Sequence, residues 1–241
     1  MIKILIAIVA IFLVYKLLPV IFREAGRLAG TNGDFEKGLK RLKTAVKLSG
    51  NVKNKNLYGY MLMQNGRFRD AITVFNEVIL DRAILPANKI TSKVYRAMAK
   101  IKMGEKQEAL EDAEEIFESV KNTLTYALLG YMRQANGMAA LDFCLDAYDY
   151  NDDDRDICDN LAVAYYMTGD YESAKETAEE VREKFPNFVE GYYHSAQIAA
   201  KMGDKKSALE FLEQIANCNR TIMTTVSVED IEALKEELKN A

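Results

Sequence analysis

The sequence predicts an all-α protein, an α-solenoid of about six helix-turn-helix repeats. A transmembrane anchor is predicted at residues 1–22, the repeats at 23–220 and a C-terminal capping helix at 227–240. The first observation behind this prediction is composition. Ala, Leu, Glu and Lys dominate the 241 residues, proline occurs three times and tryptophan is absent. Such side chains favour helices because they lose little rotamer freedom on a helical backbone.

The second observation is an internal repeat of six apolar octets, whose starts lie 31 to 38 residues apart. The octets are GLKRLKTA at 38–45, AITVFNEV at 71–78, ALEDAEEI at 109–116, ALDFCLDA at 140–147, AKETAEEV at 174–181 and ALEFLEQI at 208–215. A glycine precedes each octet, at Gly33, Gly66, Gly104, Gly137, Gly169 and Gly203. Because glycine tolerates the left-handed conformation that ends a helix, each repeat is predicted to be helix, tight turn, helix. One pair cannot bury its apolar face alone, so neighbouring pairs must stack.

The residues around the turns resemble the tetratricopeptide repeat family. The fifth repeat carries Leu161, Ala162, Tyr165, Gly169, Tyr171, Ala174 and Pro186, and the sixth carries Tyr192, Ala196, Gly203, Ala208 and Leu212. The second carries Gly59, Leu62, Gly66, Phe68, Ala71 and Phe75. The resemblance covers residues 19–220, although the first, third and fourth repeats depart from the family pattern. An insertion at 79–89 is expected to lengthen a helix or loop without breaking the stack.

The last segment, SVEDIEALKEELKN at 227–240, has the pattern of a closing helix. Ser227 is placed to cap it, with Asp230 three residues on as an approximate capping box. Ile231, Leu234 and Leu238 form one apolar stripe and the remaining residues are mostly charged. Such a helix covers the end of a solenoid with one face and meets water with the other.

Residues 4–22, ILIAIVAIFLVYKLLPVIF, are the predicted membrane anchor. Nineteen helical residues span about 28 Å, close to the hydrocarbon thickness of a bilayer. The alternative is a cleaved signal peptide, with an apolar core at 4–15. The following KLLPVIFRE lacks the small-x-small pattern that a signal peptidase needs, which favours a retained anchor.

The charge that follows this segment predicts an orientation. Residues 23–55 carry nine Lys or Arg against three Asp or Glu. Basic flanks stay on the cytoplasmic side, so the N-terminus is expected outside and the repeats in the cytoplasm. The anchor and its basic flank would then contact the lipid bilayer through residues 4–22.

No catalytic constellation is found in the sequence. His194 is the only histidine, and no phosphate-binding or nucleophile motif is present. Cys144, Cys158 and Cys218 show no metal-ligand spacing. Residues 105–190 carry 22 acidic against seven basic side chains, which argues against a nucleic-acid partner. We therefore expect no enzyme activity, no cofactor, no metal and no nucleic acid.

The family resemblance implies a concave groove lined by the first helices of successive repeats. It places the following residues there, some of which will be packing residues: Lys53, Asn56, Tyr60, Met63, Val94, Met98, Tyr131, Gln134, Asp159, Tyr166, Tyr193 and Gln197. Tyrosine and methionine suit an extended or helical peptide because they offer large or adaptable contact area. The paired Lys, Asn and Arg of the family's carboxylate clamp for chaperone tails are missing.

The predicted function is a membrane-anchored scaffold or receptor that captures a partner protein segment in this groove near the bilayer. The alternative is an extracytoplasmic chaperone-like or assembly subunit of a secretion or envelope machine. The flank charge alone separates the two. The sequence does not determine the partner, the pathway, whether the anchor is cleaved, or whether the chain forms a homo-oligomer.

Overall fold

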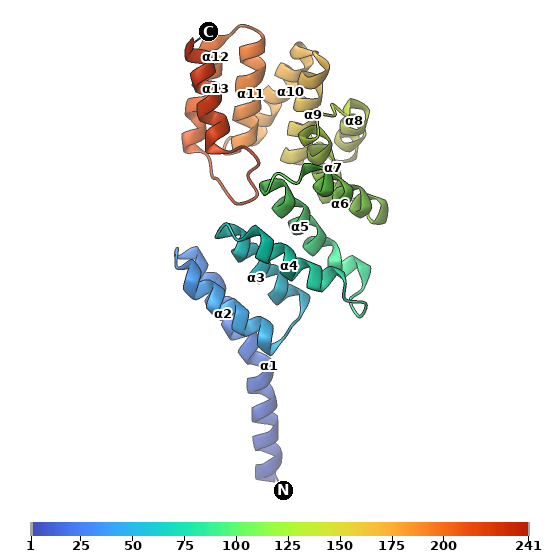
Figure 1. Ribbon diagram of the computed structural model, residues 1–241, viewed down its shortest axis with the longest axis vertical. Helices are drawn as coiled ribbons and strands as arrows, with labels where there is room; N and C mark the ends of the chain where they lie inside the picture. Colours follow the sequence, from blue (N-terminus) through green and yellow to red (C-terminus); the bar gives the residue numbers. More distant parts are fainter. Residues whose placement is uncertain (1, 241) are drawn as a thin grey trace. The chain divides into compact units, whose positions relative to one another are not determined.

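The computed structural model describes the backbone of residues 2–240 and the side chains of residue 12 and residues 14–240. The predicted all-α fold is confirmed, since every regular element among these residues is a helix (Figure 1). The chain divides into two compact units, Met1–Asp112 and Ala113–Ala241, and the division falls inside one helix. Each unit has stacked helical pairs of its own.

Unit 1 contains α1 (Ile2–Thr31), α2 (Phe35–Leu48), α3 (Val52–Gln64), α4 (Phe68–Ile79), α5 (Ile90–Lys102) and the start of α6 (Lys106–Ser119). Helix α1 pairs with α2 and α3 pairs with α4, while α2 packs on α3 and α4 packs on α5. The insertion after α4 forms a loop with the short 3-10 helix η1 (Pro86–Lys89). The stack therefore continues past the insertion, as predicted.

Unit 2 contains the rest of α6, then α7 (Thr123–Ala135), α8 (Leu141–Tyr150), α9 (Arg155–Thr168), α10 (Tyr171–Lys184), α11 (Val189–Lys201), α12 (Lys205–Gln214), the 3-10 helix η2 (Ile215–Asn217) and α13 (Val228–Asn240). Helix α9 packs against its pair partner α10 and also against α7 and α11. The first helices of successive repeats thus lie side by side and form one face of the unit.

The turns between paired helices follow the predicted chemistry. All six turn glycines have positive φ, between 70° and 86°. At the fifth repeat, the Gly169 amide donates to the Tyr166 carbonyl and the Asp170 amide donates to the Tyr165 carbonyl, each at 3.1 Å. The Asp170 carboxylate then accepts from the Ser173 amide and caps α10. One glycine ends a helix and the next residue begins another.

Close approach of paired helices depends on a missing side chain in the first of them. A Cβ placed on Gly59 of α3 would lie 2.4 Å from Cε1 of Phe75 on α4, a ring that is 0% exposed. The ring of Phe75 therefore packs directly on the backbone of α3. This contact fixes the separation of the two helices in the second repeat.

The predicted transmembrane helix and the localisation built on it are wrong. Among the described residues, no helix combines the length and the apolar character needed to cross a bilayer. The described part of α1 carries Lys16, Arg23, Glu24 and Arg27, and these charges interrupt its apolar run. The predicted single-pass topology and lipid contact through residues 4–22 have no support from these helices. Part of that prediction, the side chains of residues 4–11 and 13, lies outside the described residues.

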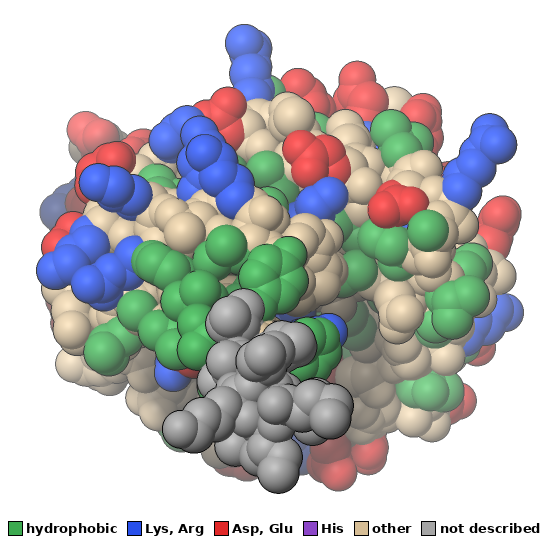
Figure 2. Space-filling view, turned by 90° about the horizontal axis from the view of Figure 1, so that it is seen from below, with side chains coloured by type: hydrophobic (Ala, Val, Ile, Leu, Met, Phe, Trp, Pro, Cys, Tyr) green, Lys and Arg blue, Asp and Glu red, His purple; other side chains and the backbone are tan. Residues whose placement is uncertain are grey.

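Helix α1 runs without a break through the predicted domain boundary at residues 22 and 23. Its C-terminal half packs on α2 as the first helix of the first repeat, whereas its N-terminal half extends beyond α2 (Figure 1). Apolar side chains gather on this end of unit 1 (Figure 2). Phe12, Tyr15, Leu17 and Ile21 are each more than half exposed.

The C-terminal helix begins as predicted. The Asp230 amide donates to Ser227 Oγ at 3.0 Å, and the Ser227 amide donates to Asp230 Oδ2 at 2.9 Å, which completes the capping box. Ile231 and Leu238 are both 6% exposed and pack in one cluster with residues of α11 and α12. The opposite side of α13 is charged and exposed.

We predict that Gly59→Ala is less stable than Gly30→Ala by about 1–3 kcal/mol, the usual cost of overpacking a core. Both changes gain the same helix propensity. At Gly59 the new methyl meets a fully buried ring, whereas at Gly30 it meets Cε of Met61, the end of a flexible side chain. Urea unfolding followed by circular dichroism measures the difference. Equal unfolding midpoints would contradict the role of the Gly59 contact.

Candidate functional site

The predicted groove residues divide between the two units. The unit 1 face, formed by α3 and α5, carries Lys53, Asn56, Tyr60, Met63, Val94 and Met98. The unit 2 face, formed by α7, α9 and α11, carries Tyr131, Gln134, Asp159, Tyr166, Tyr193 and Gln197. Each face belongs to one unit, so each is considered separately.

Half of the residues on the unit 1 face have no surface to offer a partner. Met63, Val94 and Met98 are 0%, 3% and 4% exposed and belong to the core. Asn56 is also buried, and its Oδ1 accepts a hydrogen bond from Ser92 Oγ at 2.6 Å. That bond links α3 to α5. These four residues hold the face together from behind.

Lys53 and Tyr60 are the accessible members of the unit 1 face. Lys53 is exposed near the start of α3. Tyr60 is half-buried, and its ring centroid lies 5.4 Å from that of Tyr95 on α5. Tyr95 in turn contacts the Phe75 ring at 5.7 Å, which anchors the aromatic pair to the core. Partial burial raises the pKa of Tyr60, so its hydroxyl stays protonated and able to donate a hydrogen bond.

Two residues of the unit 2 face join neighbouring first helices. Gln134 of α7 donates from Nε2 to the backbone carbonyl of Asn160 on α9, at 2.6 Å. Asp159 of α9 faces His194 of α11, with His194 Nδ1 at 2.9 Å from Oδ2 and 3.0 Å from Oδ1. The two contacts tie α7, α9 and α11 together.

The histidine in this network is held in its charged form more strongly than an ordinary histidine. Burial by itself lowers the pKa of His194, but the adjacent Asp159 carboxylate, with a further contribution from Glu190, reverses that effect. The net result is a pKa raised above the ordinary value of 6.5. The side chain of His194 is 20% exposed and that of Asp159 is 8% exposed.

The chain's own C-terminal loop reaches the unit 2 face at Glu190, the second residue of α11. The Glu190 carboxylate is 6% exposed and accepts from the Thr225 backbone amide at 2.6 Å and from Thr225 Oγ1 at 3.2 Å. Thr225 also bonds to Tyr131 of α7. Burial and the Glu190 charge raise the pKa of Tyr131 to about 12, although the bond to Thr225 acts in the opposite direction. The loop thus covers predicted groove residues.

The remaining predicted residues of the unit 2 face lie near the acidic side of α13. The pKa values of Tyr166 and Tyr193 are raised first by burial and also by carboxylates of α13, Glu237 for both and Asp230 for Tyr193. Gln197 donates from Nε2 to the Tyr193 hydroxyl at 3.4 Å. Neutral tyrosine hydroxyls therefore face this helix.

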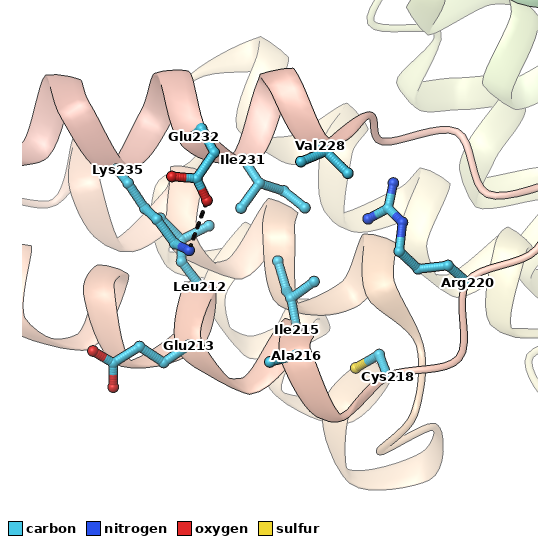
Figure 3. A pocket seen from close by; sticks show the side chains of 10 residues that line it. All are labelled: Leu212, Glu213, Ile215, Ala216, Cys218, Arg220, Val228, Ile231, Glu232 and Lys235. Atoms are coloured by element: carbon cyan, nitrogen blue, oxygen red, sulfur yellow. Dashed lines mark hydrogen bonds and ion pairs between the residues drawn. The ribbon is translucent and has the colours of Figure 1, made fainter.

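A pocket of about 410 Å³ opens between α12, η2 and α13 (Figure 3). Leu212, Ile215 and Ile231 supply its apolar lining, and Figure 3 shows Ile231 pointing from α13 toward Ile215. Lys235 and Glu232 pair on α13 at 3.0 Å. Cys218 also lines the pocket, but burial raises the pKa of its thiol, which disfavours the nucleophilic thiolate. The pocket is a gap in helix packing that lacks an activated nucleophile.

Among the described residues there is no group of three or more His, Cys, Asp or Glu side chains placed to hold a metal ion. The two buried thiols, Cys144 and Cys158, have pKa values raised to about 12 by burial. These cysteines are packing residues, as their composition predicts.

Three sequence models described as tetratricopeptide repeat match the chain, at residues 23–88, 160–187 and 189–219. Together these matches span just over half of its length. The chain belongs to the tetratricopeptide repeat family. The matches contain the second, fifth and sixth repeats, whose residues carry the resemblance most fully. A comparison with curated protein sequences found no match.

Solved structures of tetratricopeptide repeat proteins share the fold. One from Parabacteroides merdae has 16% identity and a TM-score of 0.67, with 92% of this chain and 86% of that chain covered. A thermophilic one from Thermus thermophilus has 16% identity and a TM-score of 0.61, with 79% and 100% covered. The pilF protein of Pseudomonas aeruginosa has 11% identity and a TM-score of 0.63, with 92% and 99% covered. Identities this low establish the fold alone.

The sequence analysis missed Tyr95, Glu190 and Thr225. Tyr95 and Glu190 are on first helices of repeats, next to positions that the family pattern selects, so a wider pattern would have included them. Thr225 lies outside every repeat, and no local pattern connects it to Glu190, 35 residues away. His194 was expected to be structural or at the groove edge, and it is a partner of the predicted groove residue Asp159.

We predict that His194→Gln destabilises the protein more at low pH than at high pH. The folded-state pKa of His194 is raised, so the ion pair stabilises the fold fully below the ordinary pKa of 6.5 and loses this effect as pH rises through the folded-state pKa. The loss at pH 6 should be roughly 1.5–3 kcal/mol, the value of a hydrogen bond to a charged group. Urea unfolding at several pH values measures it.

The control is Lys206→Gln, which removes a positive charge that is 87% exposed and paired with Glu210 at the surface. Its effect should be small at every pH. A His194→Gln effect that is constant between pH 5.5 and 9 would contradict a charged His194.

Proposed function

We propose that the chain is a protein-interaction scaffold that captures a partner segment on the faces formed by the first helices of its repeats, without catalytic turnover. Its repeats indicate protein–protein interaction or peptide binding. The finer assignment, to particular residues, rests on the unit 1 face. There an exposed lysine and a half-buried tyrosine pair stand above a buried core.

The Tyr60–Tyr95 pair is the single observation that carries this proposal. Two aromatic rings fixed by Phe75 offer a large, rigid contact area whose entropy cost on binding is low. Aromatic anchors of this kind dominate the energy of many interfaces. The hydroxyl of Tyr60 adds a hydrogen-bond donor to the apolar ring.

The charge of unit 1 indicates the partner's chemistry. Residues 23–112 carry 18 Lys or Arg against 10 Asp or Glu, and Lys53 brings this positive charge to the face. Basic surfaces attract and orient segments of opposite charge. The proposed ligand of unit 1 is therefore a peptide segment with an apolar anchor residue and nearby Asp or Glu.

Selection of peptides from a displayed library on the full chain tests this function. A selected peptide should bind the Tyr60→Ala variant at least tenfold more weakly, which is the effect expected when an aromatic anchor is lost. Lys53→Glu should also weaken binding, and the weakening should shrink at high salt because exposed charges are screened. Fluorescence anisotropy of the labelled peptide measures both.

Lys43→Glu is the matched control because it makes the same charge change at an exposed position of α2, a second helix of a repeat. It should change affinity much less than Lys53→Glu. Peptides that bind Tyr60→Ala, Lys53→Glu and the unchanged chain equally would overturn the assignment of the unit 1 face. Circular dichroism confirms that each variant is folded.

A further inference from the structure

The unit 2 face differs from the unit 1 face because a segment of the same chain lies on it. This C-terminal segment, residues 219–240, comprises the loop after η2 and helix α13. Its Thr225 reaches two first helices, bonding to Glu190 on α11 and to Tyr131 on α7. The loop therefore spans the unit 2 face instead of turning directly from α12 into α13.

The contacts of the loop are those that a bound peptide makes. Glu190 is a buried carboxylate, and it receives both a backbone amide and a side-chain hydroxyl from the same residue, Thr225. Any peptide has backbone amides, so this carboxylate can serve a segment from elsewhere equally well. Val226, the next residue, is 5% exposed and belongs to the same apolar cluster as Val189 of α11.

Helix α13 adds an amphipathic helix to this loop. Ile231 and Leu238 pack with Ala196 of α11 and Leu212 of α12, and Leu234 lies against the same cluster. Apolar residues spaced by three and four positions are the anchors by which a helix docks in a groove. The segment thus presents a hydroxyl-bearing loop followed by a helical anchor.

The fit of the segment is incomplete in two respects. The 410 Å³ pocket separates the first turns of α13 from α12 and η2, so apolar side chains there lack full packing (Figure 3). The charges of the segment and of the unit beneath it have the same sign. Residues 113–218 carry 21 acidic against nine basic side chains, and the segment carries five acidic against three basic. Like charges weaken this docking.

We propose that residues 219–240 are a built-in ligand, which occupies the unit 2 face and yields it to a partner segment with the same loop and apolar spacing but a basic helix. This inference rests on the proposed function, since it names how one of the two faces is regulated and what it takes. Tethering gives the built-in segment a local concentration in the millimolar range, so an external segment binds only after the tethered one has been loosened.

Hydrogen exchange of the full chain, with three versions compared, gives the first test. Thr225→Asp places a carboxylate beside Glu190 and should detach the segment, so the amides of 228–240 should exchange at least tenfold faster. Protection of α9 and α11 should stay within threefold. The control Asn219→Asp adds the same charge at an exposed position of the same loop and should behave like the unchanged chain.

Loss of α11 protection together with that of α13 would overturn the proposal, because the segment would then be an integral part of the core. Unchanged protection of 228–240 in Thr225→Asp would overturn it as well. Both outcomes identify α13 as a structural cap only.

A binding measurement gives the second test, with a fluorescein-labelled peptide of residues 219–240 as the probe. It should bind the Thr225→Asp chain but not the unchanged chain, and adding Tyr193→Ala should weaken that binding at least tenfold. The same peptide with Glu237→Lys should bind several-fold tighter than the unaltered peptide, and the gain should fall at high salt. Equal binding to Thr225→Asp and the unchanged chain, or no gain from Glu237→Lys, would overturn the proposal.

These experiments contain no ligand of unit 1. Failure here leaves capture by the unit 1 face unaffected, and failure of the peptide selection on Tyr60 leaves the built-in ligand unaffected. The two results are therefore distinguishable.

Discussion

The close approach of the two helices in a repeat is the constraint on which the rest of this structure depends. In the second repeat it rests on Gly59, whose missing side chain lets the Phe75 ring lie against the backbone of α3. That contact fixes Phe75, which in turn supports Tyr95 and, through it, Tyr60. The accessible aromatic surface of unit 1 is thus the outer end of a chain of contacts that begins at a glycine. A binding surface built in this way is rigid because its support lies in the core.

Unit 2 reaches the same arrangement of first helices but connects them with polar groups. The His194–Asp159 pair and the Gln134 bond to Asn160 join three helices that also pack through small apolar residues. Buried polar groups carry a desolvation cost, so each must find a partner. Their arrangement aims carboxylates and tyrosine hydroxyls at one face. Such a face suits backbone amides and hydroxyls, which are the groups that Thr225 brings to it.

The two faces therefore differ in accessibility and in charge. The unit 1 face is basic and exposes Lys53 beside Tyr60, whereas the unit 2 face is acidic and carries residues 219–240. Two faces of opposite charge on one chain select different ligands, because electrostatic complementarity contributes more to specificity and association rate than to raw affinity. A scaffold with one open face and one internally occupied face can hold one partner constantly and admit a second only when the tethered segment is displaced.

The sequence by itself determined the helical pairs, their turns and the capping box of α13. These depend on local causes, such as Gly169 in a left-handed turn and Ser227 opposite Asp230, and local causes are visible in a string of letters. The predicted membrane anchor failed because an apolar run at 4–22 continues into the charged, packed half of α1. Only the tertiary structure decided which groove positions are accessible, since Met63 and Tyr60 share a helix but differ in burial through neighbours from other repeats. It alone brought Thr225 to Glu190 and Tyr131, because contacts between distant residues depend on how whole helices stack.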